Sequence, residues 1–350
     1  MMNKIFIPLL LGILLLSTTI LSAKEIDYSK IDLHARQAPQ NIHTDIGRLV
    51  KYLNKPATND YERVRSFYSW IADNIAYDVK LFKSYRPSHY QPLSPADVLK
   101  RRRAVCQGYA ELFQEMCQKV GIKSYVVGGY SKGFGYTPKA KFTVADHAWN
   151  VVQIEGKWHL IDVTWGSGGL NDKMKFIKQF NEQYFLTDPK VFVFNHLPLA
   201  PMWQLLECPV PIKTYAQGEE QIKNHLSQSK RNCLNYNRQI EEFERKSEKE
   251  RMFFVATMAY DFNPDNPVVL ARARMDQANQ LMSSIPRQLS SREVILEAIK
   301  TQELALSYLT KAQNLVKAVK GTSADQEKKL IASNIKTSEQ NLRGMKNAIR

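Results

Sequence analysis

Cys106 lies near the start of the stretch whose residue types are best suited to chemistry, which runs from Arg101 to Trp165 of this 350-residue chain. It lies where a basic run, Lys100 to Arg103, gives way to apolar residues at helical spacing, and Gly121 is a natural stop for that helix. A cysteine in the first turn of a helix lies beside unpaired backbone N–H groups and the positive end of the helix dipole. Both favour the thiolate, which is the nucleophilic form of cysteine. The arginines are expected to act in the same direction, although a solvated face is their simpler interpretation.

Two segments after the cysteine helix are predicted strands. They read VADHAWNVVQI and KWHLIDVTW, both rich in β-branched and aromatic residues, and only Glu155 and Gly156 separate them. Such segments around a short glycine-containing loop predict a β-hairpin. An even loop, for instance these two residues alone, pairs Trp149 with Asp162.

The register of this hairpin decides whether His147 and Asp162 can meet. In the even register they are diagonal neighbours on one face, about 7–8 Å apart at the backbone, which a hydrogen bond between the side chains can span. An odd loop would place them on opposite faces. Together with Cys106 they would form a nucleophile, a general base and an orienting group. His159 has the opposite parity to Asp162 and is expected on the other face.

At these residues the sequence resembles the transglutaminase-like (papain-like) cysteine enzymes. AVCQGYAELF, DHAWNVV and WHLIDVTW match that family in its order of Cys, His and Asp, and the likeness covers roughly residues 60–206. The segment EQYFLTDPKVFVFNHLPLAPMWQLL looks like the branch related to the kyphoscoliosis peptidase and to fungal cytokinesis proteins. The resemblance implies an exported bacterial member with an α+β core, in which the catalytic cysteine at a helix N-terminus packs on an antiparallel sheet.

Each of these residues also has a purely structural interpretation. A lone cysteine on a helix is usually a core residue, a lone histidine in a strand is more often a satisfied sheet residue, and a lone aspartate often ends a strand. The joint occurrence of Cys106, His147 and Asp162 favours catalysis over these interpretations. His196, further along, is expected to be a core or cleft-edge residue outside the triad.

Residues 1–23 are predicted to be a secretory signal peptide. Lys4 precedes the apolar run IFIPLLLGILLL, which is too short for a membrane anchor, and the segment ends Leu21-Ser22-Ala23 with a small residue at the expected cleavage point. We therefore expect an exported protein, periplasmic or secreted, that does not span the membrane once the signal is removed.

The composition is that of an ordinary globular chain with a strong positive charge. Hydrophobic residues make up 44% of the chain, and the formal net charge is +15 at pH 7. In an exported protein this charge suggests an anionic neighbour, such as a cell-wall polymer, lipid head groups or an acidic protein substrate. No nucleic-acid motif is recognised, so nucleic acid is not an expected partner.

The four cysteines fit an exported thiol enzyme. Cys106 and Cys117 lie about 16 Å apart along one helix and cannot bridge each other, so Cys117 is expected in the core. Cys208 and Cys233 form either a disulfide in an oxidising compartment or two unpaired buried thiols. The sequence holds no CxxC, HExxH or EF-hand motif, so neither a metal site nor a cofactor is expected.

Three segments follow the signal peptide: an N-terminal arm (24–58), the catalytic domain (59–211) and a helical domain (212–350). A short helix is expected in the arm near Asp45 to Leu53, and Asn59 caps the first helix of the catalytic domain. Around the site we expect a strand from Ser124 to Gly129, a mobile loop or lid from Lys132 to Lys141, and a second flexible connection, GSGGLND. Tyr85 and Tyr90 are candidates for lining the substrate cleft, whereas Tyr77 is expected to be a packing residue.

The final segment is charged, nearly free of glycine and patterned as amphipathic helices. We predict about four helices, with a bundle as their expected arrangement, and a frayed helix from about Gly321 to the end. A spacer or partner-docking role is a hypothesis for this domain.

The expected reaction is attack of Cys106 on an amide carbonyl of a protein or peptide, giving an acyl-enzyme thioester. His147 would take the thiol proton and later protonate the leaving amine, while Asp162 would hold the imidazole. The backbone N–H of Cys106 is one expected oxyanion donor. Hydrolysis of the thioester is favoured, because the calcium loops of the calcium-dependent cross-linking enzymes are not found. The alternatives are acyl transfer to an amine, as in a transglutaminase, or a non-catalytic scaffold that binds through its helical domain and positive surface.

Overall fold

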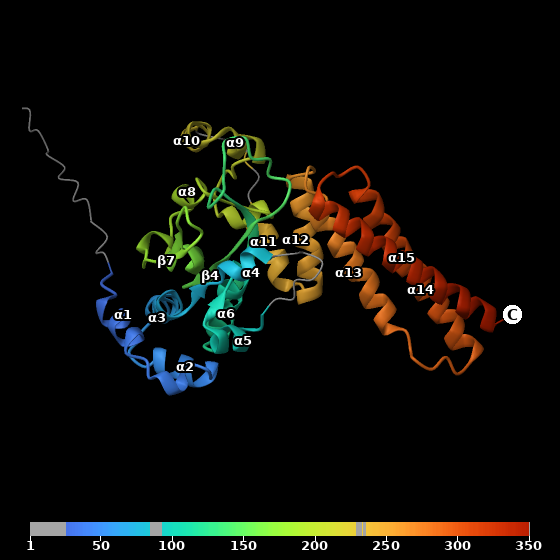
Figure 1. Cartoon of the computed structure of the whole chain (residues 1–350), viewed down its shortest axis with the longest axis horizontal. Coiled ribbons are helices and arrows are strands. Elements are labelled where there is room, and N and C mark those ends of the chain that lie inside the picture. The colour runs from blue at the N-terminus through green and yellow to red at the C-terminus, as the bar shows by residue number, and fades with distance from the viewer. Residues whose placement is uncertain (1–25, 85–92, 229–232, 234–235, 350) are drawn as a thin grey trace, which may run out of the picture.

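The computed structural model describes residues 26–84, 93–228, 233 and 236–349. The predicted signal peptide lies outside the described residues, as do Tyr85 and Tyr90. Figure 1 shows a mixed α/β body, from which a long helical arm extends toward the C-terminus.

A four-stranded antiparallel sheet forms the centre of the body. Its strands run in the order β5-β4-β3-β8, with β3 at Ser124–Ser131, β4 at His147–Ile154, β5 at Lys157–Ile161 and β8 at His196–Pro198. The predicted α+β core on an antiparallel sheet is confirmed, and so is the strand expected from Ser124.

The hairpin between β4 and β5 has the predicted even register. Ile154 pairs with Lys157 and Asn150 with Ile161, so the next pair outward is Trp149 with Asp162. Glu155 and Gly156 form the turn with φ of 51° and 76°, the two positive values that a type I′ turn requires.

Two helices cover one face of this sheet. α3 (Asp60–Asn74) and α6 (Cys106–Gln118) pack against Val152, Ile154 and Ile161. α6 begins at Cys106, and the chain leaves it through Gly121 with φ of 76°, as predicted. The sequence pattern therefore placed the cysteine correctly in the first turn of its helix.

The N-terminal arm packs into the same core. It holds α1 (Ser29–Arg36), the 3₁₀ turn η1 (Gln40–Ile42) and α2 (Ile46–Leu53), of which only α2 was predicted. Leu49 and Leu53 of α2 are fully buried. Residues of the arm thus share a core with α3 and α6.

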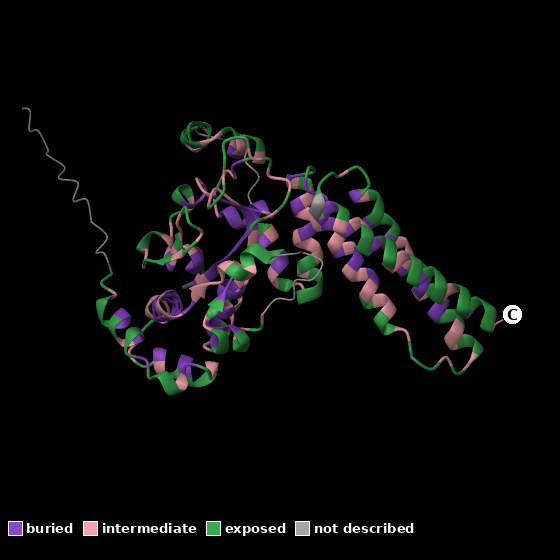
Figure 2. Cartoon of the chain, viewed as in Figure 1, coloured by how far each residue is buried: buried purple, intermediate pink, exposed green. Residues whose placement is uncertain are grey.

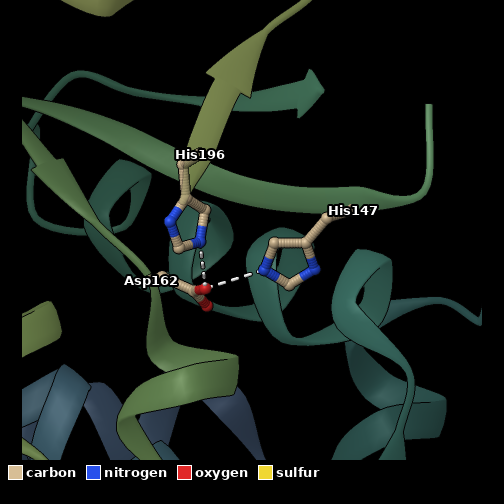
Figure 3. A group of neighbouring side chains, drawn as sticks. All are labelled: His147, Asp162 and His196. Carbon is tan, nitrogen blue, oxygen red and sulfur yellow. Dashed lines mark hydrogen bonds and ion pairs between the residues drawn. The ribbon is translucent and has the colours of Figure 1, made fainter. Parts of the chain in front are cut away.

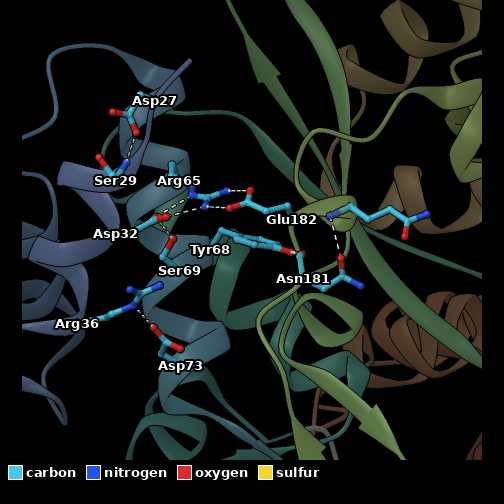
Figure 4. A network of polar contacts seen from close by, with 11 residues as sticks. Asp27, Ser29, Asp32, Arg36, Arg65, Tyr68, Ser69, Asp73, Asn181 and Glu182 are labelled. Atoms are coloured by element: carbon cyan, nitrogen blue, oxygen red, sulfur yellow. Dashed lines mark hydrogen bonds and ion pairs between the residues drawn. The ribbon is translucent and has the colours of Figure 1, made fainter. Parts of the chain in front are cut away.

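A buried ion-pair network fixes α1 to α3 (Figure 4). The Arg65 guanidinium on α3 donates to the Asp32 carboxylate at 2.7 and 2.6 Å and to the Glu182 carboxylate at 2.5 Å. The Ser69 hydroxyl also donates to Asp32. Because Asp32 lies on α1 and Glu182 in the 3₁₀ turn η2 (Glu182–Tyr184), one arginine joins three distant segments.

Short elements complete the body around the sheet. They are β1 (Ala76–Tyr77), α4 (Val79–Ser84), α5 (Pro95–Arg101), β2 (Arg103–Ala104), α7 (Val163–Gly166), β6 (Gly168–Leu170), β7 (Phe176–Lys178), α8 (Pro189–Phe192) and η3 (Pro201–Gln204). The expectation of a flexible connection at GSGGLND was wrong, because β6 pairs with β7 as a small hairpin. Gly168 permits this pairing: its φ is 139°, and a Cβ there would lie 2.1 Å from the Ile177 carbonyl oxygen.

Helices of the C-terminal segment cover the other face of the sheet and then leave the body. They are α9 (Ile212–Gln217), α10 (Glu219–Ser227), α11 (Asn237–Arg245), α12 (Glu248–Phe262), α13 (Val268–Ser284), α14 (Arg292–Val316) and α15 (Thr322–Ala348). Phe243 of α11 packs with Trp149 of the sheet and Trp203 of η3 in one cluster. Residues predicted to lie in separate domains therefore share this part of the core.

The last three helices form the extended arm. Its outer surfaces are exposed, and its buried residues lie where the helices meet (Figure 2). The frayed end expected after Gly321 is instead the 27-residue helix α15, which buries Ile331 and bonds Ser338 to Gln302 of α14. Of the helices in the described residues, none combines the length and hydropathy needed to cross a membrane.

Cys208 and Cys233 form a disulfide, with their Cα atoms 5.2 Å apart. This decides between the two states that the sequence left open. The bridge spans 25 residues and joins the segment after η3 to the segment before α11. It therefore ties the sheet-bearing body to the helices that cover it.

We expect replacement of both Cys208 and Cys233 by serine to lower the free energy of unfolding by about 3 kcal/mol, because the unfolded chain gains loop freedom. Urea denaturation measures this difference. Dithiothreitol should destabilise the wild type and leave the double variant unchanged; an equal effect on both proteins would contradict the prediction.

Candidate active site

His147 and Asp162 meet at one end of the β4–β5 hairpin (Figure 3). His147 is the first residue of β4, and its Nε2 lies 2.7 Å from Oδ2 of Asp162. Asp162 directly follows β5 and caps α7, where Oδ1 accepts the Trp165 backbone N–H at 3.1 Å. The strand register and the helix cap together fix the carboxylate toward the imidazole.

A second histidine binds the same carboxylate oxygen. Nε2 of His196, on β8, lies 2.9 Å from Oδ2 of Asp162, and both side chains are fully buried. His196 is a core residue, as expected, but its bond to Asp162 was missed. The sequence carries no local signal for this contact, because it depends on the pairing of Ser131 on β3 with His196 on β8.

The buried charges favour an ionised carboxylate and a protonated His147. Burial disfavours the Asp162 carboxylate, yet His147 and His196 outweigh it and hold the pKa of Asp162 well below its usual range. Burial also opposes the His147 imidazolium, but Asp162 and then Cys106 outweigh it and raise the pKa of His147 to about 10. Burial lowers the pKa of His196 to about 4, so this second imidazole is neutral at pH 7.

Cys106 is the remaining predicted site residue. It is the first residue of α6 and half-buried, and Val105 before it provides no side-chain cap for the first N–H groups of the helix. Its thiol contributes to the raised pKa of His147, which indicates that the two side chains lie near each other. Because Nε2 of His147 binds Asp162, Nδ1 is the nitrogen left for the thiol.

The arginines before Cys106 do not act as one group. Arg101 and Arg103 are exposed, in accord with the solvated face that was the simpler interpretation. Arg102 adopts φ of 57° at the end of α5, and its guanidinium lies 5.0 Å from the Trp70 ring and bonds His43. The Arg102 charge is therefore engaged by these two rings.

A cleft of about 650 Å³ opens beside His147. The residues that line it include the segment from Ser131 to Phe134 and residues of the β6–β7 hairpin. Six aromatic side chains line it: Tyr77, Phe82, Phe134, Trp165, Phe176 and Tyr184. Tyr77, expected only to pack, thus also borders the site, whereas His159 faces Tyr61 on the opposite side of the hairpin, as predicted.

The family model of the transglutaminase-like superfamily matches residues 47–163. Residues 47–163 form a transglutaminase-like domain. This domain contains Cys106, His147 and Asp162, whereas His196 lies beyond its matched end. The resemblance stated from the sequence motifs is thereby confirmed at the level of the superfamily.

Two curated relatives and one solved structure are similar to the chain. The kyphoscoliosis peptidase of Mus musculus is 40% identical over 190 residues, 54% of this chain and 28% of that protein. Cytokinesis protein 3 of Schizosaccharomyces pombe is 25% identical over 182 residues, 51% of this chain and 20% of that protein. A crystal structure of a TGase covers 42% of this chain and 37% of its own, with 18% identity and a TM-score of 0.29. The chain thus spans less than a third of either relative's length.

His147, Asp162 and His196 also belong to the residue types that bind metals, and their ligand atoms lie within 4.8 Å of one another. Both imidazoles, however, direct Nε2 at the same carboxylate oxygen at hydrogen-bond distances. The structure therefore holds these three groups by direct hydrogen bonds. That the protein needs no metal stays a prediction.

The His147–Asp162 pair predicts how stability depends on pH. The pKa of His147 rises from 6.5 to about 10 on folding, so its stabilising effect is complete below pH 6.5 and is lost as the pH rises through 10. We expect the free energy of unfolding to fall over this window by on the order of a few kcal/mol. Urea denaturation at several pH values measures this slope. His147→Gln should flatten it, and an equal slope in both proteins would refute the linkage.

Proposed function

We propose that this protein is an exported thiol enzyme that acts on amide bonds of protein or peptide substrates. Cys106 is its nucleophile, His147 its general acid and base, and Asp162 the group that orients and charges the imidazole. The observation that carries the proposal is the buried Asp162–His147 bond, with Cys106 at the start of α6 close enough to raise the pKa of the same imidazole. A scaffold has no chemical need for this connected set.

In the proposed reaction the Cys106 thiolate attacks the amide carbonyl carbon, and the carbonyl π electrons move to oxygen. The backbone N–H of Cys106 donates to this oxyanion. When the C–N bond breaks, the His147 imidazolium gives its Nδ1 proton to the leaving amine, and a thioester remains. The neutral imidazole then removes a proton from water, which hydrolyses the thioester and releases the acid and the thiolate.

The choice of hydrolysis over amine transfer depends on which nucleophile reaches the thioester. The cleft beside His147 is open to solvent on the side of Phe134, whose side chain is 52% exposed. Water access supports hydrolysis as the proposed outcome. Incubation of a glutamine-containing peptide with a labelled primary amine tests the alternative, since only acyl transfer incorporates the label.

Export is part of the proposal. The apolar run after Lys4 supports a cleavable signal peptide, and the Cys208–Cys233 disulfide fits an oxidising compartment. Mass spectrometry of the protein recovered from a secreting host tests this directly. We expect an N-terminus just after Ala23, and an intact Met1 terminus would argue against export.

The first test of the site is alkylation by iodoacetamide as a function of pH. Cys117 is fully buried and Cys208 is bonded to Cys233, so Cys106 is the thiol within reach of the reagent. We expect one equivalent of label, taken up rapidly below neutral pH because the imidazolium stabilises the thiolate.

Two variants complete this experiment. Cys106→Ala should remove the label, and His147→Ala should slow labelling at pH 6 by about tenfold or more, since an unpaired thiol with a pKa near 8.5 is mostly protonated there. If Cys106 reacts only as fast as free cysteine at every pH, the enzyme proposal fails.

A further inference from the structure

The cleft beside His147 contains one acidic side chain among the described residues that line it, Asp146. Asp146 directly precedes β4, the strand that begins with His147, and its Oδ1 accepts the Ser131 backbone N–H at 2.7 Å. Its own N–H donates to the Gly129 carbonyl at 3.0 Å. These bonds anchor the carboxylate at the mouth of the cleft, where the residue is exposed.

Among the described residues, no lysine or arginine forms an ion pair with Asp146. Lys132 lines the same cleft, but its ammonium lies 4.0 Å from the Tyr215 ring centroid, toward α9. The His147 imidazolium acts on the Asp146 charge, but it is bonded to Asp162. The carboxylate of Asp146 is thus available to a ligand in the cleft.

The aromatic side chains add a second preference for positive charge. A cleft that holds a carboxylate together with aromatic rings suits ammonium and guanidinium groups, through charge and cation–π attraction. The same surroundings disfavour an acidic ligand. Tyr77, Phe82 and Phe134 are among the rings that line the cleft together with Asp146.

We propose that Asp146 makes this cleft a binding subsite for a lysine or arginine side chain of the peptide substrate, near the amide bond that Cys106 attacks. The assignment rests on the proposed function and adds the class of substrate to it. The remaining surface of this +15 chain attracts acidic partners. The expected substrate is therefore a neutral or acidic polypeptide with a basic residue beside the cleaved bond.

Binding to the Cys106→Ala protein tests this subsite without turnover, so the result does not depend on whether the thiol is reactive. The probes are capped pentapeptides that carry lysine or norleucine at the central position, titrated by NMR. We expect the lysine peptide to bind about five- to tenfold more tightly. In the Cys106→Ala, Asp146→Asn protein this preference should fall below about twofold, because asparagine keeps the acceptor for Ser131 but loses the charge.

Asp172→Asn in the same background is the matched control. Asp172 is exposed on the β6–β7 turn and does not line the cleft, so the lysine preference should persist. The proposal is overturned if the parent protein shows no lysine preference, if Asp146→Asn retains it, or if Asp172→Asn removes it equally. Failure of iodoacetamide labelling, by contrast, would count against the proposed enzyme and not against the subsite.

A different observation, the shared oxygen of Asp162, carries a second inference. His196 donates Nε2–H to Oδ2 of Asp162, the oxygen that also accepts from His147. Its Nδ1 lies 2.6 Å from the side-chain amide of Asn195, whose NH₂ group donates to the neutral imidazole. Phe192 stacks on its ring at 4.0 Å, and Trp165 lies at 4.4 Å on another side. The ring can therefore neither rotate nor reach solvent.

We infer that His196 is a positioning residue, which holds the Asp162 carboxylate in the orientation that directs His147 toward Cys106. His196→Leu should slow iodoacetamide labelling of Cys106 at pH 6 between about ten- and a hundredfold, since misplacement of a reacting group by 1 Å has effects of this size. His196→Gln retains an N–H donor and should recover most of the rate.

Thermal denaturation of both His196 variants separates positioning from folding. If the two variants are equally stable and only His196→Leu labels slowly, the positioning role holds. The inference is wrong if Cys106 is labelled at the wild-type rate in both variants. It is also wrong if the labelling rate falls to the same extent in both variants while their stabilities are equal.

Discussion

Replacing Asp162 by asparagine is expected to slow acylation of Cys106 by about 10⁴-fold while the fold is retained. Asparagine keeps Oδ1 as the acceptor for the Trp165 N–H, so the cap of α7 survives. At the position of Oδ2 it presents an NH₂ group, which cannot accept from His147 or His196. His147 would then carry its proton on Nδ1 in the neutral form and be unable to take the thiol proton.

Acylation by p-nitrophenyl acetate measures this effect without knowledge of the natural substrate, because each thioester that forms releases one nitrophenolate. Loss of the carboxylate should also lower the pKa of His147 from about 10. The pH above which the acylation rate falls should therefore be lower in the variant.

Asp188→Asn is the matched control for this prediction. Asp188 also caps a short helix, accepting the Lys190 N–H at 2.7 Å at the start of α8, and no histidine of the described residues bonds it. It should leave the acylation rate unchanged within about twofold. Equal rates in wild type and Asp162→Asn would remove Asp162 from the mechanism.

The parts of the site that the sequence predicted are those with local signals. The start of α6 at Cys106 follows from helical spacing and a glycine stop, and the meeting of His147 with Asp162 follows from a two-residue turn. Each needs information from fewer than about twenty neighbouring residues.

The parts that were missed depend on contacts between distant segments. His196 reaches Asp162 only because β8 joins the sheet beside β3, and no pattern around His196 specifies that pairing. The packing of Phe243 against the sheet likewise depends on a contact between distant segments. The polar composition of α15 led to the prediction of a frayed end. The helix is nevertheless formed, since a helix that packs along one narrow side needs few apolar residues.

Replacing Arg65 by leucine is expected to lower the free energy of unfolding by about 3–5 kcal/mol, because Arg65 binds Asp32 of the N-terminal arm. The Arg65 side chain is 1% exposed and the Asp32 side chain 11%, so the variant leaves a carboxylate buried without its partner. Glu182 is 68% exposed and regains water, so it contributes little to the loss. Urea denaturation at pH 7 measures the change.

Arg63→Leu is the matched control, because Arg63 lies on the same helix and pairs with Asp60 at a partly exposed site. It should cost less than about 1 kcal/mol. Adding Asp32→Leu to Arg65→Leu should restore much of the stability, since a leucine pair leaves no charge buried. If the double variant is as unstable as Arg65→Leu alone, the loss comes from the aromatic packing of Arg65, whose guanidinium lies 4.9 Å from the Phe185 ring, and not from the stranded Asp32 charge.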